Sequence, residues 1–107
     1  MTKEEMDKLD VFLAENVIGW EWCQLLGGWI PYENCTFGEI ILKSEWCPTT
    51  NLAQAIECAE KTGLPYHINK IGVSSYFCEV GNSNSFAYEN TLSLAVSLAC
   101  KKAWEGK

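Results

Sequence analysis

The chain of 107 residues contains no arginine, and its positive charge comes from eight lysines set against fourteen aspartates and glutamates. The formal net charge is −6 at pH 7. A protein that binds DNA or RNA neutralises rows of phosphates with clustered basic side chains, which this chain lacks. The composition therefore predicts that the protein binds no nucleic acid.

The sequence also lacks a long hydrophobic run. No stretch approaches the roughly 18 consecutive apolar residues that a membrane span requires. The first ten residues, MTKEEMDKLD, are charged from position 3 onward and lack the apolar segment of a secretory signal. We therefore expect no membrane partner and a cytoplasmic location, where the six cysteines stay reduced.

Catalytic and metal-binding motifs are missing as well. The sequence has no G-x-x-x-x-G-K-[ST] loop, no G-x-S-x-G elbow and no G-x-G-x-x-G fingerprint. Cys23, Cys35, Cys47 and His67 offer four potential zinc ligands, but no two of these cysteines have the two- to four-residue spacing of structural zinc sites. A cysteine nucleophile would depend on His67, the one histidine in the chain, as its base. We expect no enzyme activity, no metal and no cofactor.

Three helices are well marked in a chain whose length and 48% hydrophobic content fit one domain, residues 1–107. Thr2 and Glu5 have the spacing of a capping box, and an apolar stripe follows, which predicts a helix over residues 3–18. A second helix begins at the cap Asn51 and ends before Gly63. The last segment, after Asn90, is rich in alanine and ends in lysines, which favours a third helix.

Two segments between the helices are predicted to be strands, residues 36–43 and 68–80, with a loop at 81–85. The order helix, strand, helix, strand, helix predicts an α/β or α+β fold in which a small sheet is covered by three helices, an α-β-α sandwich. The helix side of the core is expected to comprise Leu9, Leu13, Val17, Leu52, Ile56, Leu94 and Leu98.

Three segments resemble a known family. AENVIGW (14–20), TTNLAQAIECAEKTGL (49–64) and YENTLSLAVSLACKKAW (88–104) are similar to small phage and prophage proteins that carry the phage α-β-α (ABA) sandwich domain. The most distinctive motif is GWxW, next to the first helix. The resemblance implies a helix–sheet–helix sandwich of bacteriophage origin, and hence the cytoplasm of a bacterial host. It implies no catalytic residue.

The aromatic segment from residue 20 to residue 47 is the candidate functional region. It contains four of the five tryptophans, and aromatic side chains on short strands and loops are efficient binding anchors. We expect at least one of these four to be substantially exposed, and Glu21, Glu33 and Glu45 to steer a basic partner. The candidate binding residues are Trp20, Glu21, Trp22, Trp29, Tyr32 and Trp46.

Three functions are compatible with these residues. The first is a non-catalytic phage accessory protein that binds and inhibits a host protein, such as a component of antiviral defence. The second is capture of a small nucleotide-derived signalling molecule, with a tryptophan stacked on the base and phosphate at the helix starts near Thr50 and Asn90. The absence of arginine counts against it and leaves Lys43 and Lys70 as the nearest cations in sequence to the aromatic and strand segments. The third is a component of phage assembly. The oligomeric state is left open.

Overall fold

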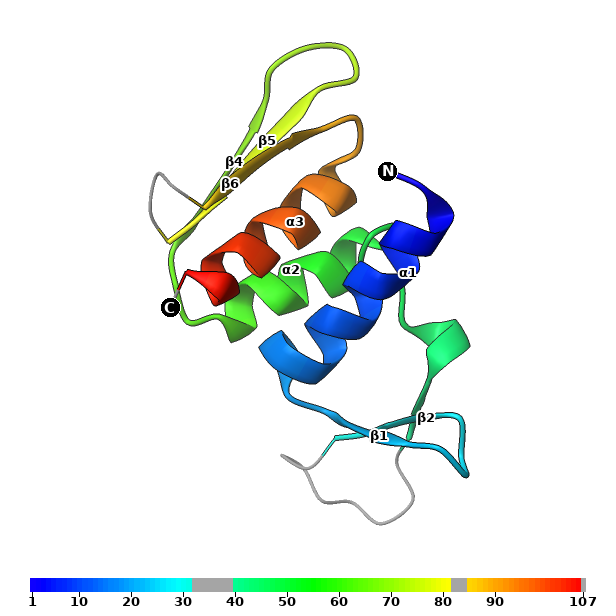
Figure 1. Ribbon diagram of the computed structural model, residues 1–107. Helices are drawn as coiled ribbons and strands as arrows, with labels where there is room; N and C mark the ends of the chain where they lie inside the picture. The colour runs from blue at the N-terminus through cyan, green and yellow to red at the C-terminus, as the bar shows by residue number, and fades with distance from the viewer. Residues whose placement is uncertain (32–39, 82–84, 107) are drawn as a thin grey trace.

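The computed structural model describes residues 1–31, 40–81 and 85–106 (Figure 1). Within these residues, six strands form two three-stranded antiparallel sheets, one of β1, β2 and β3 and the other of β4, β5 and β6. The elements in chain order are α1 (Lys3–Phe12), η1 (Leu13–Ile18), β1 (Glu21–Cys23), β2 (Gly28–Ile30), β3 (Ile41–Leu42), η3 (Lys43–Glu45), α2 (Leu52–Lys61), β4 (Tyr66–Lys70), β5 (Tyr76–Val80), β6 (Phe86–Glu89) and α3 (Leu92–Glu105).

The first helix begins and ends where the sequence predicts. Thr2 and Glu5 form the capping box, each side chain accepting from the other's backbone N–H. The helix changes pitch after Phe12, because η1 is a π-helix, and it ends at Gly19 with a positive φ of 88°. The amides of Gly19 and Trp20 both donate to the carbonyl of Ala14, which closes this last wide turn.

The other two helices are capped by side chains that accept from the first turn. Asn51 accepts from the amide of Gln54 at the start of α2, as predicted. Thr91 accepts from the amide of Leu94 at the start of α3. Helix α3 is the central element of the fold, since it packs against α2 on one side and against β5 and β6 on the other.

The segment predicted as one strand over residues 68–80 is a hairpin, and this prediction is wrong. A turn at 71–75, rich in glycine and serine, separates β4 from β5, and the amide of Ile71 donates to the carbonyl of Ser75. The third strand, β6, was not predicted, because its four residues lie between a loop and a helix cap. The expected loop at 81–85 lies mostly outside the described residues.

The β1–β2–β3 sheet is small and lies at the other end of the molecule from the β4–β5–β6 sheet, beyond η1 (Figure 1). Of the strand predicted over residues 36–43, Ile41–Leu42 form β3, and residues 36–39 lie outside the described residues. Strand β2 pairs with both neighbours, Trp29 lying opposite Trp22 in β1 and opposite Ile41 in β3. The fold is therefore a mixed α+β fold with two sheets, which corrects the expectation of one sheet covered by three helices.

The core lies between the helices and the inner face of the β4–β5–β6 sheet. Of the seven residues expected there, Leu9, Leu13, Val17 and Leu94 are buried, and Ile56 and Leu98 pack against them half-buried. Leu52 was wrongly placed in the core, since it is 41% exposed at the first position of α2. The other face of this sheet has a cluster of aromatic rings, in which Phe77, Phe86 and Tyr88 contact one another.

Candidate functional site

Two of the four tryptophans in the aromatic segment are buried. Trp29 is 1% exposed, and its indole nitrogen donates to a carboxylate oxygen of Glu15 at 3.0 Å. Trp46 is 4% exposed and donates to the backbone carbonyl of Asp10 at 2.9 Å. Both hydrogen bonds reach the first helix, so these tryptophans fasten the β1–β2–β3 sheet and the segment after it to α1 and η1.

The other two tryptophans are half-buried, and each rests on one of the buried pair. Trp20 meets Trp46 edge-on with ring centroids 4.7 Å apart, and Trp22 meets Trp29 in the same way at 5.2 Å. The expectation that at least one of the four is substantially exposed is therefore wrong. The pairing contributes to this burial, because each half-buried ring packs against a buried one.

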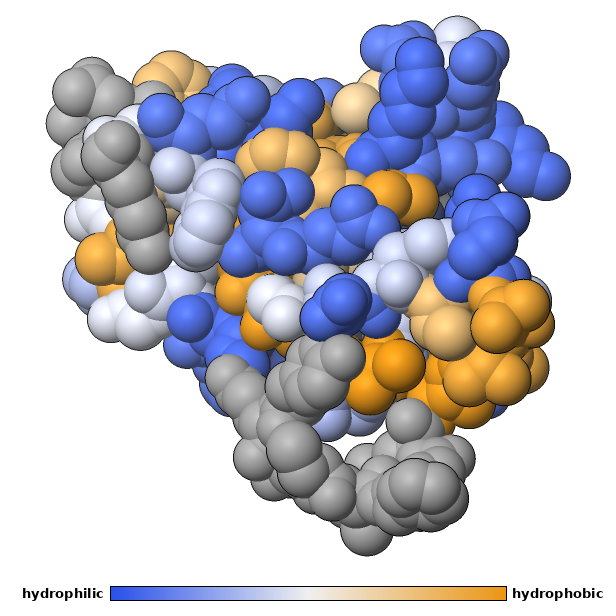
Figure 2. Space-filling view, turned by 60° about the horizontal axis from the view of Figure 1, so that its bottom comes forward, coloured by the Kyte–Doolittle hydropathy of each residue, from blue (hydrophilic) through white to orange (hydrophobic). Residues whose placement is uncertain are grey.

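Large apolar side chains also reach solvent at this end of the molecule. The turn between β1 and β2 exposes 96% of Leu25 and 58% of Leu26. It is closed by the amide of Gly27 donating to the carbonyl of Cys23, with Gly27 at a φ of 67° that favours glycine. Leu42 in β3 is 41% exposed. Figure 2, which brings this end forward, shows hydrophobic surface on the side where the hairpin lies.

Sequence reasoning missed Leu25 and Leu26 because it ranked aromatic residues first. The signal was present in QLLGG (24–28), where two large apolar residues precede a glycine pair between two tryptophans. A hairpin turn usually carries polar residues, so two leucines in this turn depart from the usual pattern. We call Leu25 and Leu26 the turn leucines.

Of the three glutamates predicted to steer a basic partner, the structure describes Glu21 and Glu45. Glu21 is exposed in β1, opposite Ile30 in β2. Glu45 is exposed at the end of η3, where its side chain accepts from the amide of Leu42 at 3.2 Å. Tyr32 and Glu33 lie outside the described residues.

A cavity lies next to the β4–β5 turn, at the opposite end of the molecule from the turn leucines. This cavity of about 850 Å³ brings together Thr50 and Asn90, the two helix starts proposed to accept phosphate. Its wall is rich in hydroxyl groups and also includes the carboxylate of Glu89. The hydroxyl-bearing residues are Thr49, Thr50, Ser74, Ser75, Tyr88, Thr91 and Ser93. Lys43 and Lys70 do not line it: Lys43 borders a small cleft beside Trp22, and the Lys70 ammonium lies 5.8 Å from the ring centre of Tyr76.

The five described cysteines are free thiols, and Cys35 lies outside the described residues. Burial raises the pKa of Cys78 to about 11 and that of Cys100 to about 12, and it raises the pKa of Cys58 further still. These three thiols stay protonated at neutral pH and are poor nucleophiles. His67 is exposed in β4, opposite Glu79.

Among the described residues, no group of three or more histidine, cysteine, aspartate or glutamate side chains is arranged to hold a metal ion. Within the same residues, no helix combines the length and the hydrophobicity of a membrane span.

Fold and surface together define a class: a small acidic α+β protein whose exposed features are an apolar hairpin turn and an open, hydroxyl-lined cavity. The chain belongs to the Phage ABA sandwich domain family, which it matches over residues 11–100. Searches of curated proteins and of solved structures gave no match. The family identifies a phage protein and assigns it no activity.

Proposed function

We propose that this phage protein acts without catalysis, by binding a host protein through the turn leucines and inhibiting it. The observation that carries the proposal is the 96% exposure of Leu25 on a hairpin that is itself held firmly. Exposing a large apolar side chain to water is unfavourable. Burying it against a partner stabilises the complex by about 25 cal/mol for each Å² of apolar surface removed from water. Anchors of this kind dominate many protein interfaces.

The support beneath the turn makes it a suitable anchor. Strand β2 is paired on both edges, and Trp29 joins it to Glu15 of η1. A turn that is already held in place loses little conformational entropy when a partner binds. The net charge of −6 favours encounter with a basic surface, because opposite potentials steer association. A component of antiviral defence is the class of partner we favour, since phage accessory proteins gain from disabling one.

The test is affinity capture from a lysate of the bacterial host. The parent chain is expected to retain a partner in stoichiometric amount. The double variant Leu25→Ser/Leu26→Ser is expected to retain at least roughly tenfold less of it. The matched control is Val73→Ser, which also replaces an exposed apolar residue, 93% exposed, in the β4–β5 turn. Equal capture by the double variant, or equal loss in the control, contradicts the proposal.

The cavity supports a second candidate function, capture of a small nucleotide-derived molecule. The observation in its favour is that Thr50 and Asn90 line one cavity of about 850 Å³, a size typical of ligand sites. The absence of lysine from the described lining weighs against a highly phosphorylated ligand. A rise in the unfolding temperature with a nucleotide, absent in the variant Tyr88→Ala, would favour this function over the first.

A further inference from the structure

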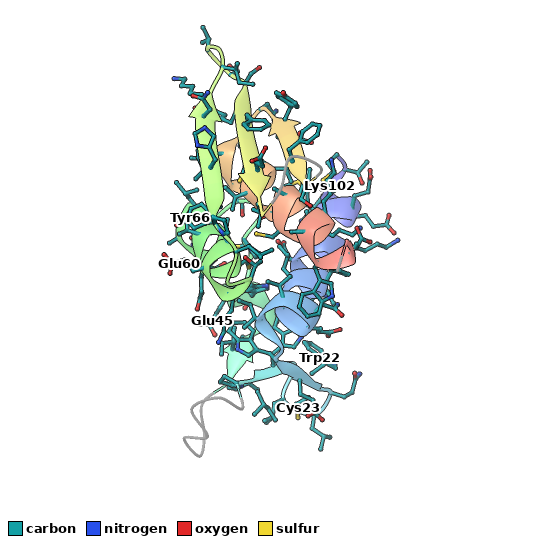
Figure 3. The ribbon with its side chains drawn as sticks, turned by 90° about the vertical axis from the view of Figure 1, so that its left-hand side faces the viewer. Trp22, Cys23, Glu45, Glu60, Tyr66 and Lys102 are labelled. Carbon is teal, nitrogen blue, oxygen red and sulfur yellow. The ribbon has the colours of Figure 1, made fainter. Side chains whose placement is uncertain are left out.

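A smaller cavity of about 400 Å³ lies between the end of η1, β3 and α2. Its aromatic walls are Trp20 and Trp46, and two carboxylates, Glu45 and Glu57, stand at its edge. Ile40, Ile41 and Gln54 complete the described lining. In Figure 3 Glu45 lies on the same side of the molecule as Glu60 of α2, whereas Trp22 lies on the other side. Neither Trp22 nor Trp29 lines this cavity.

The aromatic walls are fixed before any ligand arrives. The Trp46 ring is held by its hydrogen bond to Asp10, and Trp20 stands edge-on against it with the two ring planes at 68°. The amide of Trp20 donates to the carbonyl of Ala14 at 2.9 Å, which fixes the backbone as well. Both rings line the cavity, and an indole attracts cations.

The acidic edge is also organised. The side chain of Gln54 donates to the carbonyl of Glu45 at 2.7 Å and accepts from the amide of Cys47 at 2.7 Å, which ties α2 to the end of η3. Glu57 stands three residues after Gln54, about one turn further along α2. None of the described residues that line the cavity is a lysine. The carboxylates therefore create a negative potential next to an aromatic surface.

We propose that this cavity binds an arginine side chain of the host partner. A guanidinium group is planar, stacks on an indole face and donates two parallel hydrogen bonds to a carboxylate. The cavity offers both features, an indole wall and carboxylates at its edge. This inference rests on the proposed function, because the arginine belongs to the host protein that the proposed function takes as its partner. The turn leucines provide the apolar contact, and the tryptophan cavity provides the charge-selective one.

The test uses N-acetyl-argininamide as the probe and follows the indole N–H signals of the parent protein by NMR. The probe is expected to shift the signals of Trp20 and Trp46, and to leave that of Trp29 unchanged. N-acetyl-lysinamide is expected to bind roughly threefold more weakly, and N-acetyl-norleucinamide not at all, because cation–aromatic contacts at exposed sites are modest. Added salt is expected to weaken the binding of argininamide.

Glu57→Gln is expected to weaken argininamide binding about threefold, and Glu45→Gln/Glu57→Gln to remove it. The matched control is Glu60→Gln, which neutralises an exposed carboxylate of the same helix outside the cavity lining. Equal shifts with norleucinamide, or unchanged shifts in the double variant, overturn the inference. In that event, loss of host capture by the turn-leucine variant still supports the proposed function. If the parent protein captures no partner, that result contradicts the proposed function itself, whatever argininamide does.

Discussion

At the scale of single residues, we expect the buried thiols to contribute to the stability of the protein at alkaline pH. Cys78 is fully buried in the middle of β5, and burial raises its pKa to about 11. In the unfolded chain the pKa of a cysteine thiol is about 8.5. The folded state therefore holds this proton more tightly than the unfolded state over the interval between the two values.

The first prediction follows from this difference. The stability that the Cys78 thiol contributes is fully present below the unfolded pKa and is lost as the pH rises from about 8.5 toward about 11. We expect the denaturant midpoint to fall between pH 8 and pH 10.5, and to fall less in Cys78→Ala. A midpoint that declines equally in both proteins would show that the thiol is not responsible.

The roles of individual residues were the hardest feature to predict from the sequence. The same residue type, tryptophan, is buried at two positions of the aromatic segment and half-buried at two others. The buried residues are Trp29 and Trp46, and the half-buried ones are Trp20 and Trp22. The difference is set by contacts with α1 and η1, such as the bond from Trp29 to Glu15 and that from Trp46 to Asp10. No local pattern encodes these contacts, because their partners are 14 and 36 residues away in the chain.

At the scale of the elements, the approach of β2 to β3 depends on one small residue. A Cβ atom at Gly28 would lie 2.5 Å from the backbone carbonyl oxygen of Ile41 in the adjacent strand. Backbone cannot move aside as a flexible side chain can, so an added methyl group must separate the two strands. Gly28 thus permits the pairing that closes the sheet beneath the turn leucines.

The second prediction is that Gly28→Ala destabilises this sheet, at a cost of roughly 1–3 kcal/mol through overpacking. The matched control is Gly72→Ala in the β4–β5 turn, where the nearest atom to an added Cβ is 3.8 Å away. We expect the control to change stability by about 0.5 kcal/mol or less. Chemical denaturation followed by tryptophan fluorescence measures both, and equal stability of the two variants would refute the argument.

Helices were predicted more accurately than strands, for a physical reason. The starts of α1 and α2 are encoded by neighbouring residues, Thr2 with Glu5 and Asn51 with Gln54. The strands contain two to five residues, and their pairing is decided by partners elsewhere in the chain. The β4–β5 turn and the whole of β6 were therefore missed, although Gly72, Ser74 and Ser75 signal a turn.

At the scale of the whole molecule, the β1–β2 turn and the β4–β5 turn lie at opposite ends (Figure 1). The molecule extends 44 Å in its longest direction, with the β1–β2 turn at one end and the β4–β5 turn at the other. This separation lets one end be changed without disturbing the other. It also makes the two candidate functions distinguishable, because the hydroxyl-lined cavity lies beside the β4–β5 turn.

The sequence predicted the family, the three helices and a fold of mixed helices and strands, all of which the structure and the family match support. It did not predict that the strands divide into two sheets. The candidate region was defined by its aromatic residues, but the most exposed large apolar side chains described there are the turn leucines. Leu25 and Leu26 are exposed because they lie in the turn between β1 and β2, outside the paired strands.

The most direct test of the central claim is hydrogen–deuterium exchange of the complex between this protein and the host partner that it captures. We expect binding to slow exchange in residues 21–30, which include the turn leucines, and to leave residues 71–76 of the β4–β5 turn unchanged. Slowed exchange confined to residues 71–76 and 88–93, around the hydroxyl-lined cavity, would contradict the proposal that the turn leucines contact the partner.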